Sequence, residues 1–464
     1  MPRTVIHWFR RDLRLTDNTA LRHAVAEADQ VVPVYIISEW KKDHAWTGPN
    51  RQQFLCGCLE SLAKNLEASN SRLIFRRGDA ARELEKLIRE TGAEAVHTNR
   101  DPDPFGKEME KKVAAMCGML GVKFCTHKDV VLHEAEEVLN GDGNPYRVFT
   151  PYSKNWLSLP KDGPHGRVKS LGPPAKVSSL PPPNLATWGL DKCEAQILEP
   201  GERAARQRMK DFTEGEAVTH YKTRRDTPAG QTTSRLGQDL RFGLISIREL
   251  HARCREAAKA HRSAHEQVGT YIKELAWREF YMAVLHHWPE VLDHEFNEDF
   301  RHVPWDSDDK HLKAWQEGRT GFPIVDAGMR QLKATGFVHN RVRMIVSMFL
   351  TKDLHVYWKL GESRFMQHLV DGEIASNNGG WQLSAGTGAD AAPYFRIQNP
   401  WTQTKRYDPD GAYIKEWLPE LRGVKAEQFT APPEKPLHPD YPLPIVDHAL
   451  EREKTLKRFR KPGR

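Results

Sequence analysis

A run of small hydroxyl residues that ends in a cation occupies residues 232–235. Thr232, Thr233 and Ser234 are followed by Arg235, and a helical pattern begins after them. At a turn before a helix, hydroxyl groups and backbone N–H groups can donate hydrogen bonds to a phosphate, aided by the helix N-terminus. The segment therefore indicates a phosphate site. Helix capping with solvent-exposed neighbours is the structural alternative.

A second group places three different chemistries on one helical face. Glu274, Trp277 and Arg278 have the i, i+3, i+4 spacing that brings side chains together on a helix. A carboxylate, a large ring and a guanidinium are unfavourable to bury together, and a binding function would explain the set. The structural alternative is an exposed Glu–Arg pair beside a core tryptophan.

Two further segments contain asparagines that require an explanation. In residues 338–344, Asn340 and Met344 share a helical face, and Arg341 and Arg343 flank it. Asparagine is unfavourable in helix interiors, so we expect Asn340, in the middle of a helix, to have a hydrogen-bonding task. In residues 371–381, we expect Asn-Asn-Gly-Gly to forbid regular helix and to bring the backbone close to something flat or bulky.

Composition excludes several classes of protein. Hydrophobic residues make up 39% and charged residues 28% of the chain, and no apolar run reaches the ~18 residues that span a bilayer. The N-terminus lacks the apolar core of a signal peptide, so we expect a cytoplasmic protein without membrane segments. The six cysteines show no paired metal-ligand spacing, which predicts reduced thiols and no metal site.

Charge and aromatic content favour a nucleic-acid partner. The net charge is +7, and excess lysine and arginine favour polyanions because phosphate contacts release counterions. Eight of the 13 tryptophans lie between Trp277 and Trp417. Most buried tryptophans are core residues, but a dense set is also what a site that stacks bases or a cofactor requires.

Strand and helix patterns divide the 464 residues into three regions. Residues 1–130 alternate helical periods with strand-like runs (VIHWF, VVPVYIIS, RLIF, EAVHT, VKFC), which predicts an α/β domain with a parallel sheet. No Gly-x-Gly-x-x-Gly follows the first strand, so a standard dinucleotide site is not expected there. Residues 131–200 accumulate proline and glycine and predict an extended linker. Residues 201–464 predict an all-α domain, which ends in a Pro-rich segment and a short basic tail.

Taken together, these segments resemble the photolyase/cryptochrome family, and most closely its cyclobutane pyrimidine dimer DNA photolyases. The resemblance covers nearly the whole chain and is densest in HWFRRDLRLTDNTAL, YRVFTPYSKNW, RDTPAGQTTSRL, ELAWREFY, GFPIVDAGMRQL, HNRVRMIVSMFLTKDL and NNGGWQL. It implies an α/β antenna-type N-terminal domain, a linker and an all-α C-terminal domain that binds FAD.

The resemblance also implies which residues bind FAD. Those expected around its phosphates and ribose are Tyr221, Thr233, Ser234, Arg235 and Leu236. Asp371 is expected at the ribitol or ribose region with Arg343 as its ion-pair partner, and Glu373 near the adenine or flavin edge. Asn377 is expected to face flavin N5, where asparagine is typical of repair enzymes.

A second set of residues is implied to meet the DNA lesion or to carry electrons. The lesion-pocket residues are Glu274, Trp277, Asn340, Arg341 and Met344, and the candidate strand contacts are Arg225 and Arg396. The electron-transfer tryptophans are Trp381, Trp358 and Trp305. Three positions depart from the family pattern, namely Leu383 in place of a second clamp tryptophan, Gly237 in place of serine and Glu373 in place of aspartate.

The implied function is light-driven repair of cyclobutane dimers by electron transfer from excited reduced FAD to a flipped-out lesion. The expected partner is damaged DNA, and the protein is expected to be a monomer. A cryptochrome-like blue-light receptor and a non-repair flavoprotein are the alternatives. A second chromophore in the N-terminal domain (a folate, a deazaflavin, a second flavin or none) stays open, with Asn99, Arg100 and Asp101 as a candidate location.

Overall fold

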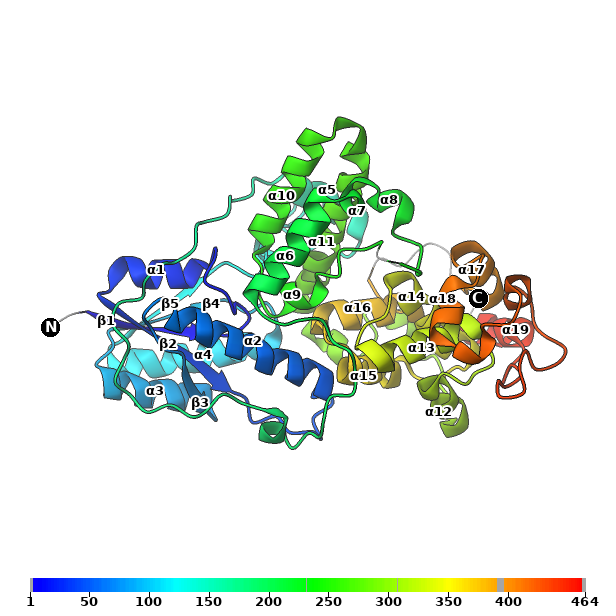
Figure 1. Ribbon diagram of the computed structural model, residues 1–464, viewed down its shortest axis with the longest axis horizontal. Coiled ribbons are helices and arrows are strands. Elements are labelled where there is room, and N and C mark those ends of the chain that lie inside the picture. The colour runs from blue at the N-terminus through cyan, green and yellow to red at the C-terminus, as the bar shows by residue number, and fades with distance from the viewer. Residues whose placement is uncertain (1–2, 231, 307, 390–395, 461–464) are drawn as a thin grey trace.

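The computed structural model describes residues 3–230, 232–306, 308–389 and 396–460. An α/β part at the N-terminal end of the long axis is followed by a helical part that extends to the other end (Figure 1). In the described ranges, no helix is both long enough and apolar enough to cross a membrane.

The α/β part is built on a five-stranded parallel sheet with strand order β3-β2-β1-β4-β5. Its strands are β1 (Thr4–Phe9), β2 (Gln30–Ile37), β3 (Ile74–Arg77), β4 (Ala95–Asn99) and β5 (Lys123–His127). Every residue of β1 is buried, as expected for a central strand that is covered on both faces. All five strand-like runs therefore form strands, and the predicted parallel sheet is confirmed.

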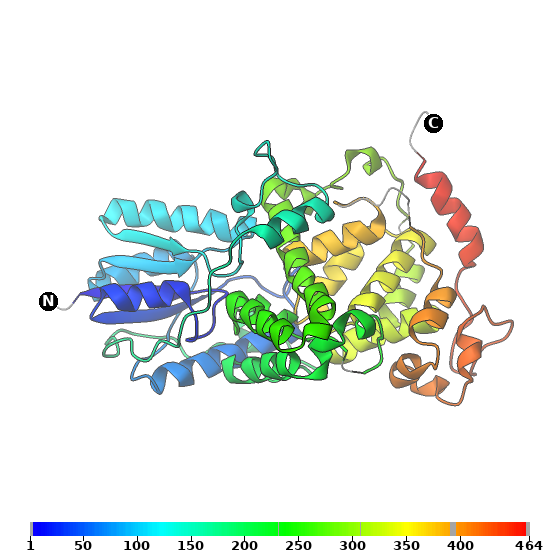
Figure 2. The same cartoon turned by 90° about the horizontal axis from the view of Figure 1, so that it is seen from above.

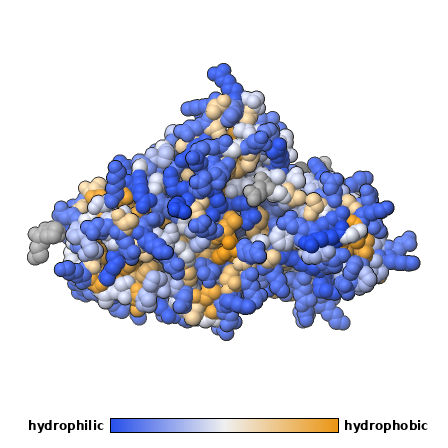
Figure 3. Space-filling model, in the orientation of Figure 1, coloured by the Kyte–Doolittle hydropathy of each residue, from blue (hydrophilic) through white to orange (hydrophobic). Residues whose placement is uncertain are grey.

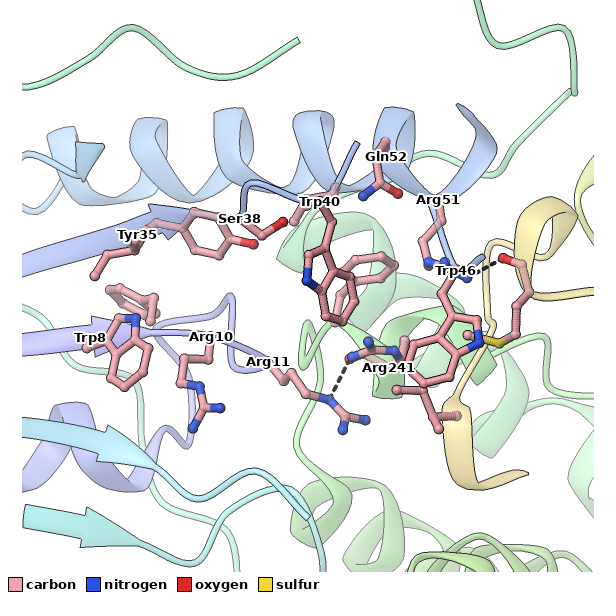
Figure 4. A pocket seen from close by; sticks show the side chains of 16 residues that line it. Trp8, Arg10, Arg11, Tyr35, Ser38, Trp40, Trp46, Arg51, Gln52 and Arg241 are labelled. Carbon is pink, nitrogen blue, oxygen red and sulfur yellow. Dashed lines mark hydrogen bonds between the residues drawn. The ribbon is translucent and has the colours of Figure 1, made fainter. Parts of the chain in front are cut away.

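Helices cover both faces of this sheet. Alternate residues of β1 pack into two different cores, because successive side chains in a strand point to opposite faces. One face packs against α1 (Thr19–Glu27) and α2 (Pro49–Glu67), and the other against α3 (Ala80–Thr91) and α4 (Pro104–Leu120). The carboxyl ends of β1 and β2 point toward the helical part (Figures 1 and 4).

The Pro-rich segment between the two parts runs along the surface and contains one α-helix, α5 (Phe149–Ser158) (Figure 1). This helix packs on the long central helix α11 (His265–His287). The contact is anchored by the buried Glu279, which accepts hydrogen bonds from Trp156 Nε1 at 2.6 Å and from the backbone N–H of Leu132 at 2.6 Å. The boundaries of the linker at 131 and 200 stay a prediction.

The described residues after 200 form helices and turns but no strand. The helices are α6 (Glu202–Glu214), α7 (Glu216–Thr219), α8 (Tyr221–Arg224), α9 (Gly237–Arg241), α10 (Ile247–Ala260), α11, α12 (Asp309–Glu317), α13 (Pro323–Thr335), α14 (Asn340–Met348), α15 (Trp358–His368), α16 (Ile374–Ala385), α17 (Pro400–Tyr407), α18 (Ala412–Trp417) and α19 (His448–Arg458). The predicted all-α C-terminal part is confirmed. The described start of the basic tail belongs to the helix α19, which docks on the fold through His448 with Asp353 at 2.5 Å and Glu451 with His355 at 2.7 Å.

Two cores hold the helical part together. One continues from the sheet into α10 and α11, and the other lies among α12 to α18 around Trp315, Trp358 and Trp381. The first core makes the sheet and the central helices one packed body (Figure 2). On the face shown in Figure 3, apolar side chains gather near the middle, and hydrophilic side chains cover most of the remainder.

Candidate functional site

The face of α11 that carries Glu274 and Trp277 is completed by the segment after α8. Arg225 Nη1 donates a hydrogen bond to Glu274 Oε1, and both side chains are about one third exposed, 35% and 31%. Burial raises the pKa of Glu274 above its ordinary value, and Arg225 opposes this shift. All three residues lie in α11, so their predicted helical spacing is confirmed. The Arg278 side chain has a different partner, because its Nη1 donates to the Val130 carbonyl at 2.9 Å.

The ring of Trp277 lies flat against another aromatic ring. Its centroid is 3.5 Å from that of Phe149, with only 10° between the planes. Phe149 is the first residue of α5, so the linker segment supplies the support for a predicted lesion-pocket tryptophan. Phe149 lies in the segment YRVFTPYSKNW but was not among the predicted lesion-pocket residues.

The second arginine pair lies at the start of α14. Arg341 Nη2 donates to Asp226 Oδ1 at 2.8 Å, and its guanidinium lies 4.6 Å from the ring centroid of Tyr407. Met344 is on the same turn, with its Sδ 3.7 Å from Arg341 Nη1. Arg225 and Arg341 thus each form an ion pair on the partly exposed surface of the helical part.

One prediction for α14 is wrong. Asn340 is the first residue of this helix rather than an interior residue, and His339 caps it by accepting a hydrogen bond from the Arg341 N–H. Asparagine is well tolerated at a helix start, where backbone N–H groups lack intrahelical partners. The exposed Asn340 therefore needs no special hydrogen-bonding task to be accommodated.

The hydroxyl segment leads into the short helix α9. Thr233, Ser234 and Arg235 are half-buried and Leu236 is buried, while Tyr221 is buried beside Tyr271, with ring centroids 5.0 Å apart. Arg235 has φ of +51°, a left-handed backbone that is uncommon for a residue with a side chain. Its guanidinium lies 3.7 Å from the ring centroid of Phe337.

An acidic residue joins this segment to α14. Arg343 Nη2 donates to Asp371 at 2.8 and 3.2 Å, so the ion pair expected between them is present. Gly237 lies directly against Asp371, because a Cβ at position 237 would be 2.8 Å from Asp371 Oδ2. Glycine at position 237 therefore leaves the space that the Asp371 carboxylate occupies.

The Asn-Asn-Gly-Gly segment is helical, which corrects a second prediction. Residues 374–385 form α16, because a glycine in a helix is unfavourable by only about 1 kcal/mol relative to alanine and packing overrides this. The flat neighbour expected beside the glycines is the ring of Tyr281, since a Cβ at Gly379 would lie 2.0 Å from Tyr281 Cδ1. The close approach was thus predicted correctly, but the interruption of the helix was not.

Asn377 presents one side of its amide. Its Nδ2 donates to the Glu362 carbonyl at 3.0 Å, and its side chain is largely buried. This orientation leaves Oδ1 as the atom that can accept a hydrogen bond from a ligand. Leu383, on the same helix, is half-buried and gives an aliphatic surface where the family pattern has a ring.

Glu373 is engaged on the side of the α/β part. It caps α16 and pairs with Arg11, which follows β1, and both side chains are nearly inaccessible, at 8% and 7% exposed. Burial alone would raise the pKa of Glu373, but Arg11, followed by Arg241 and Arg278, lowers it below the ordinary value. The predicted role at an adenine or flavin edge stays a prediction, whereas its ion pair with the α/β part was not anticipated.

The three predicted electron-transfer tryptophans lie on neighbouring elements. Trp381 of α16 lies against Gly361 of α15, where a Cβ would be 2.1 Å from its Cη2. Trp358 is the first residue of α15 and is fully buried. Tyr357 lies between Trp358 and Trp305, with centroid distances of 5.7 and 5.8 Å. A fourth aromatic ring therefore lies beside two of the three predicted tryptophans, whose role in electron transfer stays a prediction.

Arg396 is the first residue of the last described stretch and is exposed.

All six cysteines are free, as predicted. In the ranges that the structure describes, no cluster of three or more histidine, cysteine or acidic residues could hold a metal ion.

A cavity of about 240 Å³ lies where the α/β part meets the helical part, and we call it the aromatic cavity. Its aromatic side chains come from β1, β2, the loop before α2 and the residue after α9, and are Trp8, Phe9, Tyr35, Trp40, Trp46 and Phe242. Its cations are Arg10, Arg11, Arg51 and Arg241 (Figure 4). The carboxyl ends of parallel strands are where such folds bind ligands.

Two arginines of this cavity have backbone partners. Arg51 donates to the Met366 carbonyl at 2.7 Å and Arg241 to the Gly372 carbonyl at 3.2 Å. Among the described residues, neither forms an ion pair with a carboxylate. Burial lowers the pKa of Arg51 to about 9 and lowers that of Arg241. Uncompensated positive charge in a cavity favours an anionic ligand.

None of residues 99–101 lines the aromatic cavity, but Arg100 lines a second cavity of about 260 Å³, so the candidate location at these residues stays a prediction. Asn99 donates to Asp12 at 2.8 Å, Arg100 to Glu134 at 2.6 Å, and Asp101 accepts from Arg11 at 3.0 Å. The polar side chains of these three residues therefore form hydrogen bonds with other residues of the chain. The signal that could have identified the cavity is Arg10-Arg11 directly after the first strand, together with Trp40 and Trp46 before the next helix.

The helical part combines a hydrogen-bond donor and two acceptors that suit FAD. Arg235 Nε is buried and, among the described residues, has no hydrogen-bond acceptor. Asp371 lies near Arg235 and directly against Gly237, which has no side chain. Asn377 Oδ1 can accept a hydrogen bond from a ring N–H. A phosphate for the arginine, a hydroxyl for the carboxylate and a flavin edge for the amide would satisfy these groups.

Known proteins share these features. The family model for the FAD binding domain of DNA photolyase matches residues 271–461, and that for DNA photolyase matches residues 5–170. The deoxyribodipyrimidine photo-lyase of Synechococcus sp. is 39% identical over 98% of this chain and 96% of its own.

Solved structures agree with this match. A bacterial class III photolyase from Agrobacterium tumefaciens superposes with a TM-score of 0.92 at 38% identity, over 99% of this chain and 97% of its own. An archaeal photolyase from Sulfolobus tokodaii with two FAD molecules superposes with a TM-score of 0.85 at 31% identity, over 98% of this chain and 99% of its own. The chain therefore belongs to the DNA photolyase family, and its C-terminal helical part contains the FAD-binding domain of that family.

Proposed function

We propose that this protein is a deoxyribodipyrimidine photo-lyase that binds DNA carrying a cyclobutane pyrimidine dimer and splits the dimer under blue light. When bound and reduced, FAD absorbs light and supplies the electron that opens the cyclobutane ring. The observation that carries the proposal is the grouping of Glu274, Trp277 and Arg341 on the partly exposed surface of the FAD-binding part.

DNA binding is assigned to the cations of this surface. Arg225, Arg341 and Arg396 are exposed or half-buried and can reach the phosphates of a DNA strand. Arg225 and Arg341 already have carboxylate partners, Glu274 and Asp226, which hold their guanidinium groups in place. A dimer pairs and stacks poorly, so rotating it out of the duplex toward this surface is easier than rotating a normal base.

The lesion pocket is assigned to Glu274, Trp277, Asn340 and Met344. Trp277 can pack against the dimer, and Phe149 fixes the plane of its ring from the other element. Glu274 is suited to hydrogen-bond the dimer, because burial raises its pKa and makes the protonated, donating form more accessible. Such a bond strengthens when the dimer gains negative charge.

FAD binding is assigned to the residues between α8 and α16. Tyr221, Thr233, Ser234, Arg235 and Leu236 would surround the phosphates and ribose, and the pair Arg343–Asp371 would hold the sugar region. Asn377 would accept a hydrogen bond at the flavin edge, and Glu373 would act near the same edge from its ion pair with Arg11. Electrons would reach this site through Trp305, Tyr357, Trp358 and Trp381.

A second chromophore is assigned to the aromatic cavity. Its tryptophans suit a flat conjugated ring, and Arg51 and Arg241 suit an anionic group on the same molecule. Folates, deazaflavins and flavins share this chemistry. The structural relative from Sulfolobus tokodaii holds two FAD molecules, which supports a second chromophore in this family.

The test is repair of an oligonucleotide that contains one dimer. Photoreduced protein with FAD bound should restore intact thymines under blue light and not in the dark, with product measured by chromatography. The undamaged oligonucleotide is the control. FAD-containing protein that binds the lesion but repairs nothing under light would favour the receptor alternative. Monomeric state and cytoplasmic location are part of the proposal, and light scattering and fractionation test them.

A further inference from the structure

Trp358, the middle member of the proposed electron route, has a carboxylate partner. Its indole is fully buried, and its Nε1 donates a hydrogen bond to Glu295 Oε1 at 3.1 Å. Glu295 is itself only 6% exposed. A buried indole N–H needs an acceptor, but a neutral carbonyl would satisfy it as well. The presence of an ionisable acceptor in this position requires a further reason.

The loop that contains Glu295 is held firmly against α16. Gln382, next to Trp381 in this helix, accepts a hydrogen bond from the Phe296 N–H at 2.8 Å and donates to the His294 carbonyl at 3.2 Å. The Asn297 N–H donates to the Thr387 carbonyl at 2.9 Å. The carboxylate is therefore fixed in position relative to both Trp381 and Trp358.

The cations nearest to Glu295 in the chain have other partners. Arg301 pairs with Glu298 at 3.5 Å and uses its Nε for the Glu295 backbone carbonyl, and Lys359 lies 3.8 Å from Asp293. Within the described residues, the Glu295 carboxylate forms no ion pair. Its negative charge therefore faces the indole of Trp358, which donates to it, and also acts on the neighbouring Tyr357, whose pKa burial and then Glu295 raise.

We propose that Glu295 is a positioning residue and proton acceptor for Trp358 during light-driven reduction of the cofactor. The proposal rests on the electron route described under the proposed function. When one electron leaves Trp358 toward Trp381, the indole becomes a radical cation. Its Nε1–H bond breaks, a bond between that proton and Glu295 Oε1 forms, and a neutral indole radical and a neutral carboxylic acid remain.

The step reverses when the next electron arrives. An electron from Trp305, passed through Tyr357, reduces the indole radical, and the proton returns from Glu295 to Nε1. Because the indole radical and the carboxylic acid are both neutral, the site holds no uncompensated buried charge while Trp358 is oxidised. Glu295 thereby slows the return of the electron from the cofactor and increases the fraction of excitations that end in stable reduction.

The experiment uses the protein with oxidised FAD bound and follows absorption after a light pulse. Glu295→Gln keeps a hydrogen-bond acceptor but removes the charge and the basic oxygen. We expect the yield of FAD reduction to fall about tenfold, the factor controlled by an interaction of about 1.4 kcal/mol. In Glu295→Gln the transient radical on Trp358 should stay in its protonated form. In the wild-type protein the Trp358 radical should lose its proton. Glu295→Asp should recover part of the yield.

Two variants act as controls. Glu298→Gln removes an exposed carboxylate from the same loop and should behave as the wild type. Trp358→Phe tests the route itself and should abolish stable reduction. Independent of light and cofactor, the ultraviolet resonance Raman band of Trp358, isolated as the difference between wild type and Trp358→Phe, should report a hydrogen bond that weakens in Glu295→Gln.

The outcomes are distinguishable. Normal reduction in Trp358→Phe would overturn the proposed electron route and this inference with it. Loss of reduction in Trp358→Phe but a wild-type yield and radical spectrum in Glu295→Gln would overturn the role of Glu295 alone. A lower melting temperature in Glu295→Gln with unchanged radical chemistry would likewise reduce Glu295 to a structural partner.

Discussion

The helical site and the aromatic cavity both contain arginines, but these arginines have different partners. Arg225, Arg341 and Arg343 each pair with a carboxylate, at side-chain exposures of 35%, 16% and 26%. In the cavity, Arg51 is 7% exposed and, like Arg241, donates to a backbone carbonyl.

This difference indicates two ways to recognise an anion. In the helical site a ligand must share Arg225, Arg341 and Arg343 with their existing carboxylate partners, so only a ligand with well-placed groups gains affinity from them. In the cavity Arg10 and Arg11 pair with carboxylates, but Arg51 and Arg241 form no ion pair among the described residues, so a flat anion of suitable size gains affinity from these two cations. The helical site is thus built for selectivity and the cavity for retention of a tightly held molecule.

The largest expected effect is that of Trp381→Phe, which tests the electron route without changing the helical site's arginines or the aromatic cavity. Trp381→Phe should abolish light-driven reduction of oxidised FAD, because the buried Trp381 is the proposed electron donor nearest to the flavin. Repair by chemically reduced protein should stay close to wild type. Absorption of the bound cofactor under illumination measures the first, and dimer repair the second.

The matched control for that experiment is Trp315, whose ring centroid lies 6.0 Å from that of Trp381. Trp315→Phe should leave photoreduction nearly unchanged if electrons travel through Trp358. Loss of photoreduction in Trp315→Phe together with normal behaviour of Trp358→Phe would move the route to the other side of α16.

A second prediction tests the cavity. Arg51→Met should weaken binding of the second chromophore by about tenfold or more, because a hydrogen bond to a charged group contributes roughly 1.5–3 kcal/mol. The FAD content should not change. Chromophore released on denaturation and titration with a folate, a deazaflavin and a flavin measure the effect. Arg77→Met, which changes an arginine that does not line the cavity, is the control. Equal loss of FAD in Arg51→Met would show that the two regions do not bind independently.

A third prediction tests the shared arginines of the helical site. Glu274→Ala should lower the repair yield about tenfold. A hydrogen bond to a developing charge stabilises it by about 1.4 kcal/mol, which corresponds to this factor. Affinity for dimer-containing DNA should fall less, because Glu274 acts mainly once the dimer is charged. Glu266→Ala on the same helix removes an exposed partner of Lys222 and is the control. Equal losses of yield and affinity would assign Glu274 to binding alone.

The smallest expected effect concerns Leu383. Leu383→Trp should tighten binding of dimer-containing DNA within the roughly 1–3 kcal/mol range of one stacked base, and leave binding of undamaged DNA almost unchanged. Titration against both oligonucleotides, alongside melting curves, measures this. If Leu383 packs into the core, the larger ring would instead destabilise the fold by roughly 1–3 kcal/mol without a gain in lesion affinity.

Local patterns predicted the elements well and their fine structure less well. The five strands were predictable because each is a short apolar run between helical periods. The helix α16 was not, because two adjacent glycines suggest a break unless the ring of Tyr281 that packs on Gly379 is known. Asn340 was misplaced because one residue decides whether a side chain lies inside a helix or begins it.

Contacts between distant segments were beyond local patterns. Nothing near Trp277 in the sequence indicates that Phe149 covers its ring, and nothing near Glu373 indicates its pairing with Arg11. The same holds for the aromatic cavity, whose arginines come from the segment directly after β1, the helix α2 and the helix α9. These features depend on how the sheet packs against the helices, and the sequence analysis had predicted only that both exist.

The buried ion pairs between the two parts also govern how the molecule unfolds. Arg11 reaches Glu373 at the start of α16, and Arg248 of α10 reaches Asp129 at 2.7 Å and Asp17 at 3.0 Å. Opening either part alone would leave these charges buried without partners, at about 3–5 kcal/mol for each broken pair. Thermal denaturation should therefore be a single cooperative transition, and a chromophore bound at one end should raise the melting temperature of the whole chain.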